Sequence, residues 1–437
     1  MNSDQYIEQL SDELQVIYEQ LEAKYAPSAP ISTKYNTPVN FKESLNTPIH
    51  RWYGYKEGFS PLFVKGFIEK YKTNQSPTIF DPFGGVGTTV LVASQMGLKA
   101  VSTDVNPLGN FVSSVKNEIY SDNDLDLIHK QIDDFKSKSS FERFKSIDNK
   151  TVESYFYEDT LDALIRVKGY VYSIANCKIR NLFRLAVLSL VSDISTHRKD
   201  GNGVKRKRIQ PEHHTFVTLR DLVINKVLDF TKDIKEYGVH IQPEIISGSC
   251  IEPYNLPFKI DLVITSPPYA NCFDYSKVYL SELWVGDFFK QKEDQKSFRE
   301  SSVSSHVHYQ WKRIDREFSS DIINNYVAPI LNQKDLWNKK IPIMLQEYFA
   351  DMGRCLKYIS EQLNHNATVG FVVGNSVYSS VVIPTDLIIA DIAERLGYSV
   401  KEITTYRKLS ASSQQMKNID EGNKKYLRES LIVLNWK

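Results

Sequence analysis

The sequence has few cysteines and no long apolar run. Its four cysteines, Cys177, Cys250, Cys272 and Cys355, are far apart and form no C-x-x-C pair. This spacing excludes a zinc framework and a secreted-type disulfide set, and it favours a reducing compartment. No apolar run approaches the roughly 20 residues that span a bilayer, and the polar start Met1–Gln5 predicts no signal peptide. We therefore expect a cytoplasmic protein with no membrane partner.

The sequence also lacks an excess of either charge. Its 54 basic and 53 acidic residues give a net charge of +1, so a surface for nucleic acid would have to be local. The 437 residues, 41% of them hydrophobic, suffice for a sizeable core. This length predicts one large domain with insertions, or two to three domains.

A pair of prolines follows what reads as a buried strand, residues 260–264. Two prolines in Thr265-Ser266-Pro267-Pro268-Tyr269 fix the backbone and remove two N–H donors, so the chain leaves the sheet in a rigid loop. That loop presents the Ser266 hydroxyl, two unpaired carbonyls and the flat face of Tyr269. Such a cradle suits an exocyclic amino group on a planar base, and the alternative is a strand exit without chemistry.

A glycine loop provides the second signal. Residues 78–80 read as a strand, Gly84, Gly85 and Gly87 permit a tight turn, and residues 90–96 continue as an apolar helix. Strand, glycine loop and helix form the nucleotide site of open α/β sheets, at the carboxyl ends of the strands. No lysine follows the glycines, which excludes a phosphate loop of the G-x-x-x-x-G-K-[ST] type.

Two acidic residues refine this interpretation. Asp104 ends a second predicted strand, where a carboxylate can accept both hydroxyls of a ribose. Asp81 lies beside the glycine loop, where it would repel a pyrophosphate but attract a cationic amino group. The pair therefore favours a zwitterionic nucleoside ligand over a nicotinamide dinucleotide.

The D-P-F-x-G-x-G-T-T loop with a downstream T-S-P-P-Y resembles the amino-methylating DNA methyltransferases, which make N4-methylcytosine or N6-methyladenine. The similarity spans roughly residues 45–110 and 240–437. It implies S-adenosylmethionine as cofactor and Ser266, Pro267, Pro268 and Tyr269 as catalytic residues. The cofactor-binding residues that it implies are Asp81, Pro82, Phe83, Gly84, Gly85, Gly87, Thr88, Thr89, Asp104, Asn106 and Ser249. Ser249 stands where this family often has an acid near the cofactor adenine, which is a departure from the family pattern.

The resemblance implies a doubly wound, Rossmann-like α/β methyltransferase sheet. We expect a discontinuous catalytic core, residues 46–110 and 241–437, after an N-terminal helix and linker, residues 1–45. Residues 111–240 show helical periodicity and predict a helical insertion between the second and third core strands, which we consider a DNA-contact region.

The insertion ends in a basic run around the Gly201-Asn202-Gly203 sequence. Its cations are Arg198, Lys199, Lys205, Arg206, Lys207 and Arg208. We favour contact with DNA phosphates over a solvated face, because the glycines let a backbone approach closely.

Two further polar segments are open to more than one interpretation. Residues 301–313 carry His306 and His308 but no acidic or cysteine partner nearby in the sequence, so we predict a DNA-facing or mobile loop and no metal site. Residues 407–415 contain Arg and Gln, which read base edges, and predict either a recognition loop or an ordinary polar hairpin.

The resemblance implies direct methyl transfer to a base turned out of the duplex. Serine at the first motif position favours N4 of cytosine, with N6 of adenine as the alternative. Methylation of RNA or of protein glutamine is a weaker alternative, because the related enzymes that methylate those substrates usually carry Asn at the position of Ser266. The chain has no Pro-Cys dipeptide, so the covalent route to C5-methylcytosine lacks its usual nucleophile. A catalytically inactive DNA-binding module is the alternative from another class, and the intact Asp81 and Ser266 speak against it.

The expected partner is double-stranded DNA with a specific recognition site. The expected setting is a bacterial or archaeal restriction-modification system, in which the protein associates with the nucleoid and a cognate restriction endonuclease is a further partner.

Overall fold

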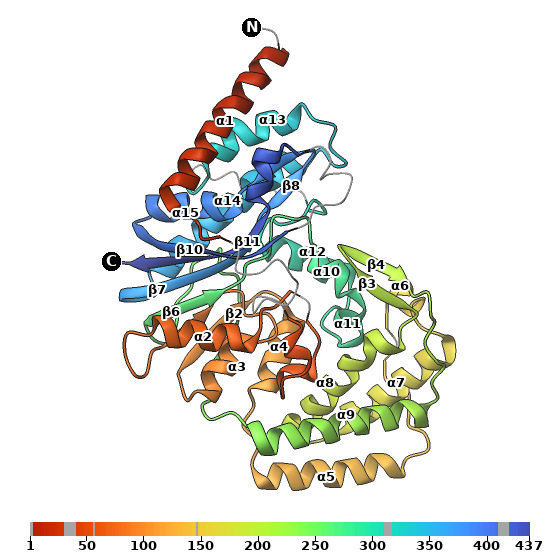
Figure 1. Ribbon diagram of the computed structural model, residues 1–437. Coiled ribbons are helices and arrows are strands. Elements are labelled where there is room, and N and C mark those ends of the chain that lie inside the picture. The colour runs from red at the N-terminus through yellow and green to blue at the C-terminus, as the bar shows by residue number, and fades with distance from the viewer. Residues whose placement is uncertain (1–2, 30–40, 56, 146, 310–316, 410–418) are drawn as a thin grey trace.

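A seven-stranded sheet forms the centre of the computed structural model, which describes residues 3–29, 41–55, 57–145, 147–309, 317–409 and 419–437 (Figure 1). The strand order is β10-β11-β7-β6-β1-β2-β5. The strands are β1 (Ile79–Asp81), β2 (Ala100–Asp104), β5 (Glu244–Ser247), β6 (Ile260–Thr265), β7 (Leu363–Gly374), β10 (Tyr398–Lys408) and β11 (Arg428–Trp436). Two small hairpins are β3 (His197–Asp200) with β4 (Gly203–Arg206), and β8 (Ser376–Tyr378) with β9 (Val381–Ile383).

The direction of the strands brings both sequence motifs to one edge of the sheet. β1 pairs in parallel with β2 on one side and with β6 on the other, and β11 is the one strand of the seven that runs antiparallel to its neighbours. The chain thus leaves β1 toward β2 and later returns to the far side of β1 as β6. Ligands of open α/β sheets bind at the carboxyl ends of strands at such a reversal.

Helices cover both faces of the sheet, which explains why its strands read as continuous apolar runs. Ile79 and Leu262 face α2 (Pro61–Tyr71) and α3 (Thr88–Gln95), in one hydrophobic cluster. The next residues, Phe80 and Val263, belong to a second cluster that includes α14 (Ile341–Ser360) and α15 (Thr385–Arg395). The predicted doubly wound α/β fold is confirmed.

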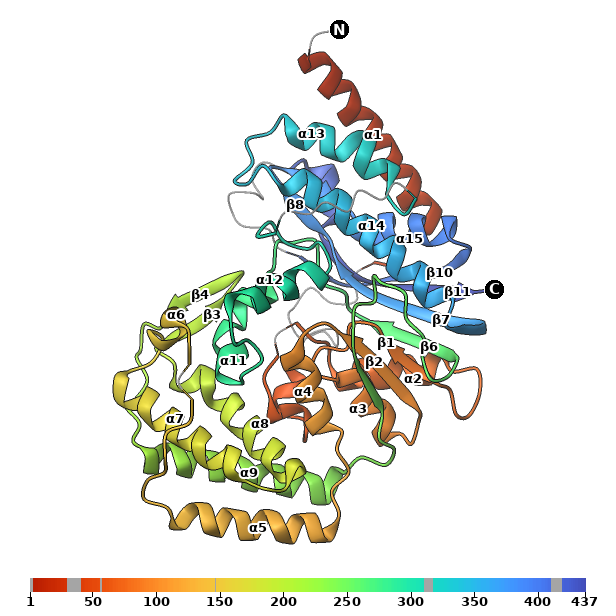
Figure 2. The same cartoon turned by 180° about the vertical axis from the view of Figure 1, so that it is seen from behind.

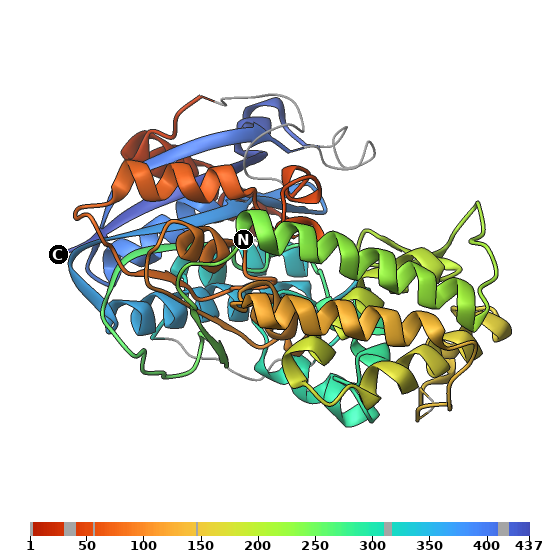
Figure 3. The same ribbon diagram turned by 90° about the horizontal axis from the view of Figure 1, so that it is seen from below.

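A helical region extends from the sheet and contains its own hydrophobic core (Figures 1 and 2). Its long helices α5, α8 and α9 pack against one another, and Figure 3 shows α5 and α9 side by side. The region consists of α5 (Asp122–Ser137), α6 (Lys150–Glu153), α7 (Glu158–Ser173), α8 (Cys177–Ile194), the β3–β4 hairpin and α9 (Phe216–Tyr237). It lies between β2 and β5 in the chain, after α4 (Pro107–Lys116).

The N-terminal helix α1 (Ser3–Tyr25) packs into the core of the sheet. Leu10, Leu14 and Tyr18 are buried in the cluster that contains α14 and α15. Arg428 of β11 also forms an ion pair with Glu22 at 2.6 Å. No helix in the described parts of the chain is long and apolar enough to cross a membrane.

The predicted DNA-facing or mobile loop, residues 301–313, belongs to a longer segment, residues 290–335, whose described part is partly helical. It contains α12 (Lys292–Ser301), a π-helical turn η3 (Ile323–Val327) and α13 (Ala328–Asn332). Val303 and His306 are 4% and 3% exposed, so residues 303–307 of the stretch that we expected to face DNA or to move are packed inside, whereas His308 is exposed. The cause is a set of isolated apolar side chains, such as Phe298 and Val303, that find partners only in the folded chain. Residues 310–316, including Trp311, Lys312 and Arg313, lie outside the described residues.

The remaining helices connect these parts. They are α10 (Tyr275–Val278), α11 (Leu280–Val285) and the 3-10 turns η1 (Glu43–Leu45), η2 (His50–Trp52) and η4 (Glu421–Tyr426).

Candidate active site

The glycine loop lies between β1 and α3, packed tightly against its surroundings. Gly87 has φ +80°, and a Cβ there would lie 2.8 Å from the Cβ of Ser113 in α4. A Cβ on Gly84 would lie 2.7 Å from the Cβ of Ser102 in β2. Side chains are thus excluded at both positions, which brings the loop backbone against α4 and β2.

Asp104 is held at the end of β2 by the loop backbone. One carboxylate oxygen accepts a hydrogen bond from Gly85 N at 2.7 Å and the other accepts from Asn106 N at 2.7 Å. The Asn106 side chain in turn caps α4 by accepting from Leu108 N at 3.1 Å. Burial raises the pKa of Asp104, and the backbone amides oppose that rise. Each oxygen keeps a second lone pair, so the fixed carboxylate can still accept hydroxyl groups from a ligand.

Asp81 is the last residue of β1 and lies beside the glycine loop. It is 3% exposed, and its oxygens accept from the hydroxyls of Thr89 at 2.6 Å and Thr265 at 2.7 Å, and from Phe83 N at 3.1 Å. Burial raises its pKa to about 6, against the opposing effect of these donors. Asp81 therefore joins the glycine loop to the strand that precedes the catalytic motif, and it does not line the pocket described next.

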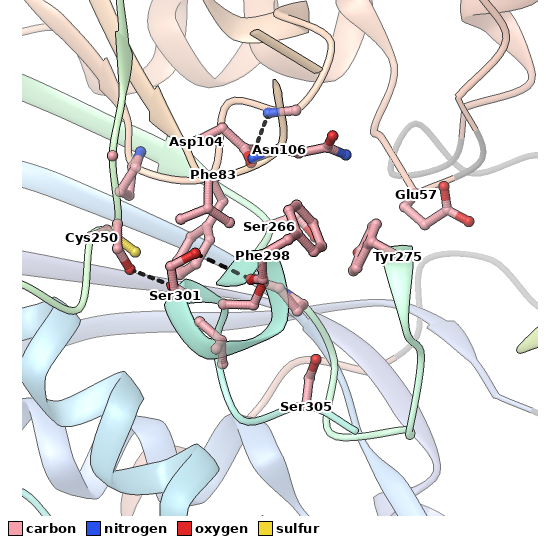
Figure 4. A pocket seen from close by; sticks show the side chains of 18 of the residues that line it. Glu57, Phe83, Asp104, Asn106, Cys250, Ser266, Tyr275, Phe298, Ser301 and Ser305 are labelled. Carbon is pink, nitrogen blue, oxygen red and sulfur yellow. Dashed lines mark hydrogen bonds between the residues drawn. The ribbon is translucent and has the colours of Figure 1, made fainter. Parts of the chain in front are cut away.

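The largest set of predicted residues meets in one cavity, here called the inner pocket. Figure 4 shows Phe83, Ser266 and Phe298 between Glu57 and Tyr275 on one side and Cys250 on the other. The predicted residues that line it are Pro82, Phe83, Gly85, Asp104, Asn106, Ser249, Ser266 and Pro268. Gly84, Gly87, Thr88 and Thr89 belong to the same loop but do not line the pocket, and neither does Pro267.

The inner pocket also contains residues that belong to neither sequence motif. Tyr55 stacks on Tyr279, with ring centroids 5.1 Å apart, and Tyr279 donates a hydrogen bond to Glu57. The segment Ser301–His306 and Phe298 close another wall, and Ser249 donates to the Ser301 carbonyl at 2.8 Å. The only sequence signal for this wall was the spacing of Phe298 and Val303 within a polar stretch.

Tyr269 opens onto a second cavity, here called the outer cavity. Its hydroxyl donates to Glu429 at 2.9 Å, and Glu429 is bonded by the Arg407 guanidinium at 2.6 and 3.1 Å. The outer cavity is lined by Asn202, Tyr269, Asn271, Trp337, Asn375, Ser376, Val377, Tyr378, Arg407, Leu409, Leu427 and Glu429. Burial is the main cause that raises the pKa of Tyr269, so the hydroxyl stays neutral and keeps its hydrogen to donate. The Thr265–Tyr269 loop, here called the catalytic loop after its predicted role, therefore contributes to both cavities: Ser266 and Pro268 line the inner pocket and Tyr269 lines the outer cavity.

The histidines of the buried segment do have an acidic partner in space. Side-chain atoms of Asp274, His306 and His308 lie within 4.8 Å of one another, although Asp274 is some thirty residues away in the chain. The guanidinium of Arg299 contacts Asp274 at 2.7 and 2.9 Å, and Ser276 donates to its other oxygen at 2.6 Å. Through Asp274, the N-cap of α10, these contacts join α10 to Arg299 of α12 beside the two histidines.

The predicted basic run forms the β3–β4 hairpin, whose two faces differ. Lys199 forms an ion pair with Glu282 at 2.6 Å and lies 3.7 Å above the Tyr279 ring. Lys207 donates to the carbonyls of Ser192 and Asp193 at 2.8 and 2.9 Å. These two cations anchor the hairpin, which revises their predicted role at phosphates. The exposed cations are Arg198, Lys205, Arg206 and Arg208, of which Arg198 and Lys205 contact Asp200 at 3.2 and 2.5 Å.

The second predicted recognition segment is only partly described. Arg407 and Leu409 line the outer cavity, and residues 410–418 lie outside the described residues.

Comparison with known proteins finds relatives that match along nearly the whole chain. The chain is 26% identical over 449 residues to the Type II methyltransferase M.BsoBI of Geobacillus stearothermophilus, covering 91% of this chain and 88% of that protein. It is 25% identical to M.AvaI of Anabaena variabilis (99% and 95% covered) and 23% identical to M.MvaI of Kocuria varians (92% and 95% covered), both also Type II methyltransferases. No family model matches the chain.

Solved structures give only a weak likeness. The rRNA methyltransferase aviRa from Streptomyces viridochromogenes aligns with a TM-score of 0.29 and 9% identity, covering 89% of this chain and 85% of that one. This score is too low to support an argument, and the assignment of the fold rests on the strand order above. The sequence relatives, in contrast, confirm the resemblance to amino-methylating DNA methyltransferases.

The inner pocket fits the cofactor of these enzymes, S-adenosylmethionine. Asp104 offers a fixed carboxylate for a ribose, Glu57 offers a second acid, and Phe83 and Phe298 offer aromatic surfaces for a planar base.

Proposed function

We propose that this relative of the Type II methyltransferases transfers a methyl group from S-adenosylmethionine to the N4 amine of cytosine at a specific site in double-stranded DNA. The observation that carries the proposal is that the catalytic loop lines both cavities. Ser266 lines the inner pocket with Asp104, and Tyr269 lines the outer cavity. A group held at this loop could be reached from both sides, which direct transfer between cofactor and base requires.

The cofactor, when bound, supplies an electrophilic methyl group at the inner side of the loop. The Ser266 hydroxyl and the Pro267 carbonyl accept the two amine hydrogens of the base and orient the nitrogen lone pair toward the inner pocket. Catalysis then rests on orientation and on hydrogen bonds that weaken conjugation of the amine with the ring. The side chain of Tyr269 provides the stacking surface for the base, whose amine is accessible only after extrusion from the duplex.

The choice of cytosine N4 over adenine N6 rests on serine at the first motif position. Adenine N6 remains the alternative, because an amine on either base can occupy the same acceptors. The sequence relatives support a Type II methyltransferase without distinguishing the two bases.

The outward face of the β3–β4 hairpin supplies the proposed DNA contacts. Lys205 is 71% exposed and Arg198 52%, and the hairpin is anchored beside the catalytic loop by Lys199. Cations fixed near the outer cavity would bind phosphates flanking the extruded base, independently of sequence.

A restriction-modification system with a cognate endonuclease is the proposed setting. The proposal is tested by sequencing DNA from cells that express the chain, with a readout that separates N4-methylcytosine from N6-methyladenine. We expect N4-methylcytosine at one short sequence. N6-methyladenine at one sequence would establish the alternative, and unmodified DNA would refute both.

A further inference from the structure

The outer cavity is completed by two segments that lie outside both sequence motifs. Its volume is about 590 Å³, within the ~300–1,000 Å³ typical of small-ligand sites. Besides Tyr269, it is lined by Trp337 from the connection between α13 and α14, and by Asn202 from the tip of the β3–β4 hairpin.

Trp337 is unusual in its exposure. It is 67% exposed, whereas tryptophan side chains are highly buried on average. The segment that carries it is nevertheless fixed, because Leu336 packs against the core and Ser379 donates to the Asp335 carbonyl at 2.9 Å. A rigidly presented indole at the edge of a polar cavity is suited to stack on a planar ring, and every nucleobase offers such a face.

Asn202 reaches the catalytic loop from the helical region. Its side-chain amide donates to the Asn271 carbonyl, two residues after Tyr269, at 3.1 Å. The flanking glycines are not required by packing, since a Cβ on Gly201 or Gly203 would meet no described atom within 4 Å. Because Gly201 and Gly203 have no side chains, the tip of the hairpin stays narrow beside the cavity.

The hairpin is held in this place by its inward face. Lys199 pairs with Glu282 in α11 and lies above Tyr279, and both residues follow the catalytic loop in the chain. These contacts of Lys199 therefore hold the hairpin against the segment that follows the catalytic loop. A carboxamide has a donor and an acceptor side by side, a pattern that complements the edges of bases.

We propose that the extruded base enters the outer cavity between Tyr269 and Trp337, and that Asn202 contacts its polar edge. Trp337 and Asn202 are then base-contacting residues supplied by segments that the catalytic motifs do not include. This inference rests on the proposed function, because it requires a base to leave the duplex.

The test compares Trp337→Ala, Trp337→Phe and Asn202→Ala with the wild type in single-turnover methyl transfer. The probe is a duplex that carries the site located by sequencing, and cofactor affinity is measured separately by calorimetry. We expect Trp337→Ala to slow transfer or weaken duplex binding roughly 5- to 100-fold, the range for loss of one stacked base. Trp337→Phe should retain most activity, and Asn202→Ala should cost about 5- to 10-fold, as for one hydrogen bond. Cofactor affinity should not change.

Two exposed apolar residues away from the cavity serve as matched controls. Leu62 and Ile209 are 63% and 89% exposed, and Leu62→Ala and Ile209→Ala should transfer at the wild-type rate. A wild-type rate in Trp337→Ala or in Asn202→Ala overturns the role assigned to that residue. A wild-type protein that does not methylate DNA would instead refute the proposed function.

Fluorescence gives a second readout for stacking. Addition of the duplex should quench wild-type tryptophan emission more than that of Trp337→Phe, and the difference should vanish on a duplex that is abasic at the target position. Equal quenching in both proteins on the intact duplex would contradict stacking on Trp337.

Discussion

The inner pocket and the outer cavity share one loop but are assembled in different ways. The inner pocket joins the carboxyl ends of β1, β2, β5 and β6 to a wall that contains Phe298 and residues 301–306. The outer cavity joins a hairpin tip, a helix connection and strands β10 and β11, which are far apart in the chain. Both cavities therefore depend on tertiary packing, but the inner pocket contains residues of both sequence motifs, whereas the outer cavity contains only Tyr269 of them.

The largest expected effect comes from the residue on the inner side of the shared loop. Ser266→Ala should slow single-turnover methyl transfer roughly 100- to 1,000-fold, the typical cost of losing one preorganised hydrogen-bond partner in an active site. Cofactor affinity should stay at the wild-type value, because only the orientation of the amine is lost. Transfer at the wild-type rate would remove Ser266 from the mechanism.

The free energy of unfolding should depend on pH through Asp81, which joins the glycine loop to β6. Its pKa in the folded protein is about 6 against an ordinary 3.8. Between these values the folded protein retains a proton that the unfolded chain has released, so rising pH lowers the free energy of unfolding. The loss should total about 3 kcal/mol between pH 4 and 6 and should be absent in Asp81→Asn.

The measurement is chemical denaturation of both proteins without cofactor across pH 4 to 8. The stability of Asp81→Asn relative to the wild type should rise across the window from pH 4 to 6 and then level off. A constant difference would show that Asp81 titrates normally.

Asp104→Ala should weaken ligand binding at the inner pocket and leave binding at the outer cavity unchanged. Loss of a charged hydrogen-bond acceptor should weaken S-adenosylmethionine binding by about 1–3 kcal/mol. DNA affinity in the absence of cofactor should not change. Calorimetric cofactor affinity equal to that of the wild type would exclude a contact between Asp104 and the cofactor.

The hairpin should show the smallest effects, and they should differ between its faces. Lys205→Ala should weaken binding to all DNA sequences alike and lower the salt slope by about one, as expected for one lost phosphate contact. Lys199→Ala should leave the salt slope nearly unchanged and slow transfer, because it releases the hairpin from Glu282. Equal salt slopes for the wild type and Lys205→Ala would assign Lys205 to a solvated face.

Elements next to the motifs could be predicted from sequence because local chemistry determines them. The strand expected over residues 260–264 is β6, Ile260–Thr265. The start of α2 is equally local, because the Ser60 hydroxyl accepts from Phe63 N at 3.1 Å as an N-cap and Pro61 follows at the first helical position. Asp104 could be placed because parallel strands end at the same edge of a sheet.

Features that depend on distant partners could not be predicted. The basic run gave no sign that Lys199 and Lys207 point inward, because that requires the register of β3 with β4 and the position of Glu282. The sequence also does not identify Asp274 as the partner of His306, because the two residues meet only in the folded chain. The sequence likewise does not show that Thr89 and Thr265 donate hydrogen bonds to Asp81.

The most direct test of the account is methyl transfer by the purified chain. Methyl-labelled S-adenosylmethionine and unmodified duplex DNA would be incubated with the protein, and the DNA digested to nucleosides and separated. The account predicts label in N4-methyldeoxycytidine, and label in N6-methyldeoxyadenosine would shift it to the alternative base. Label in 5-methyldeoxycytidine, or DNA that stays unlabelled while the protein binds the cofactor, would contradict direct transfer to an amine at the Ser266 loop.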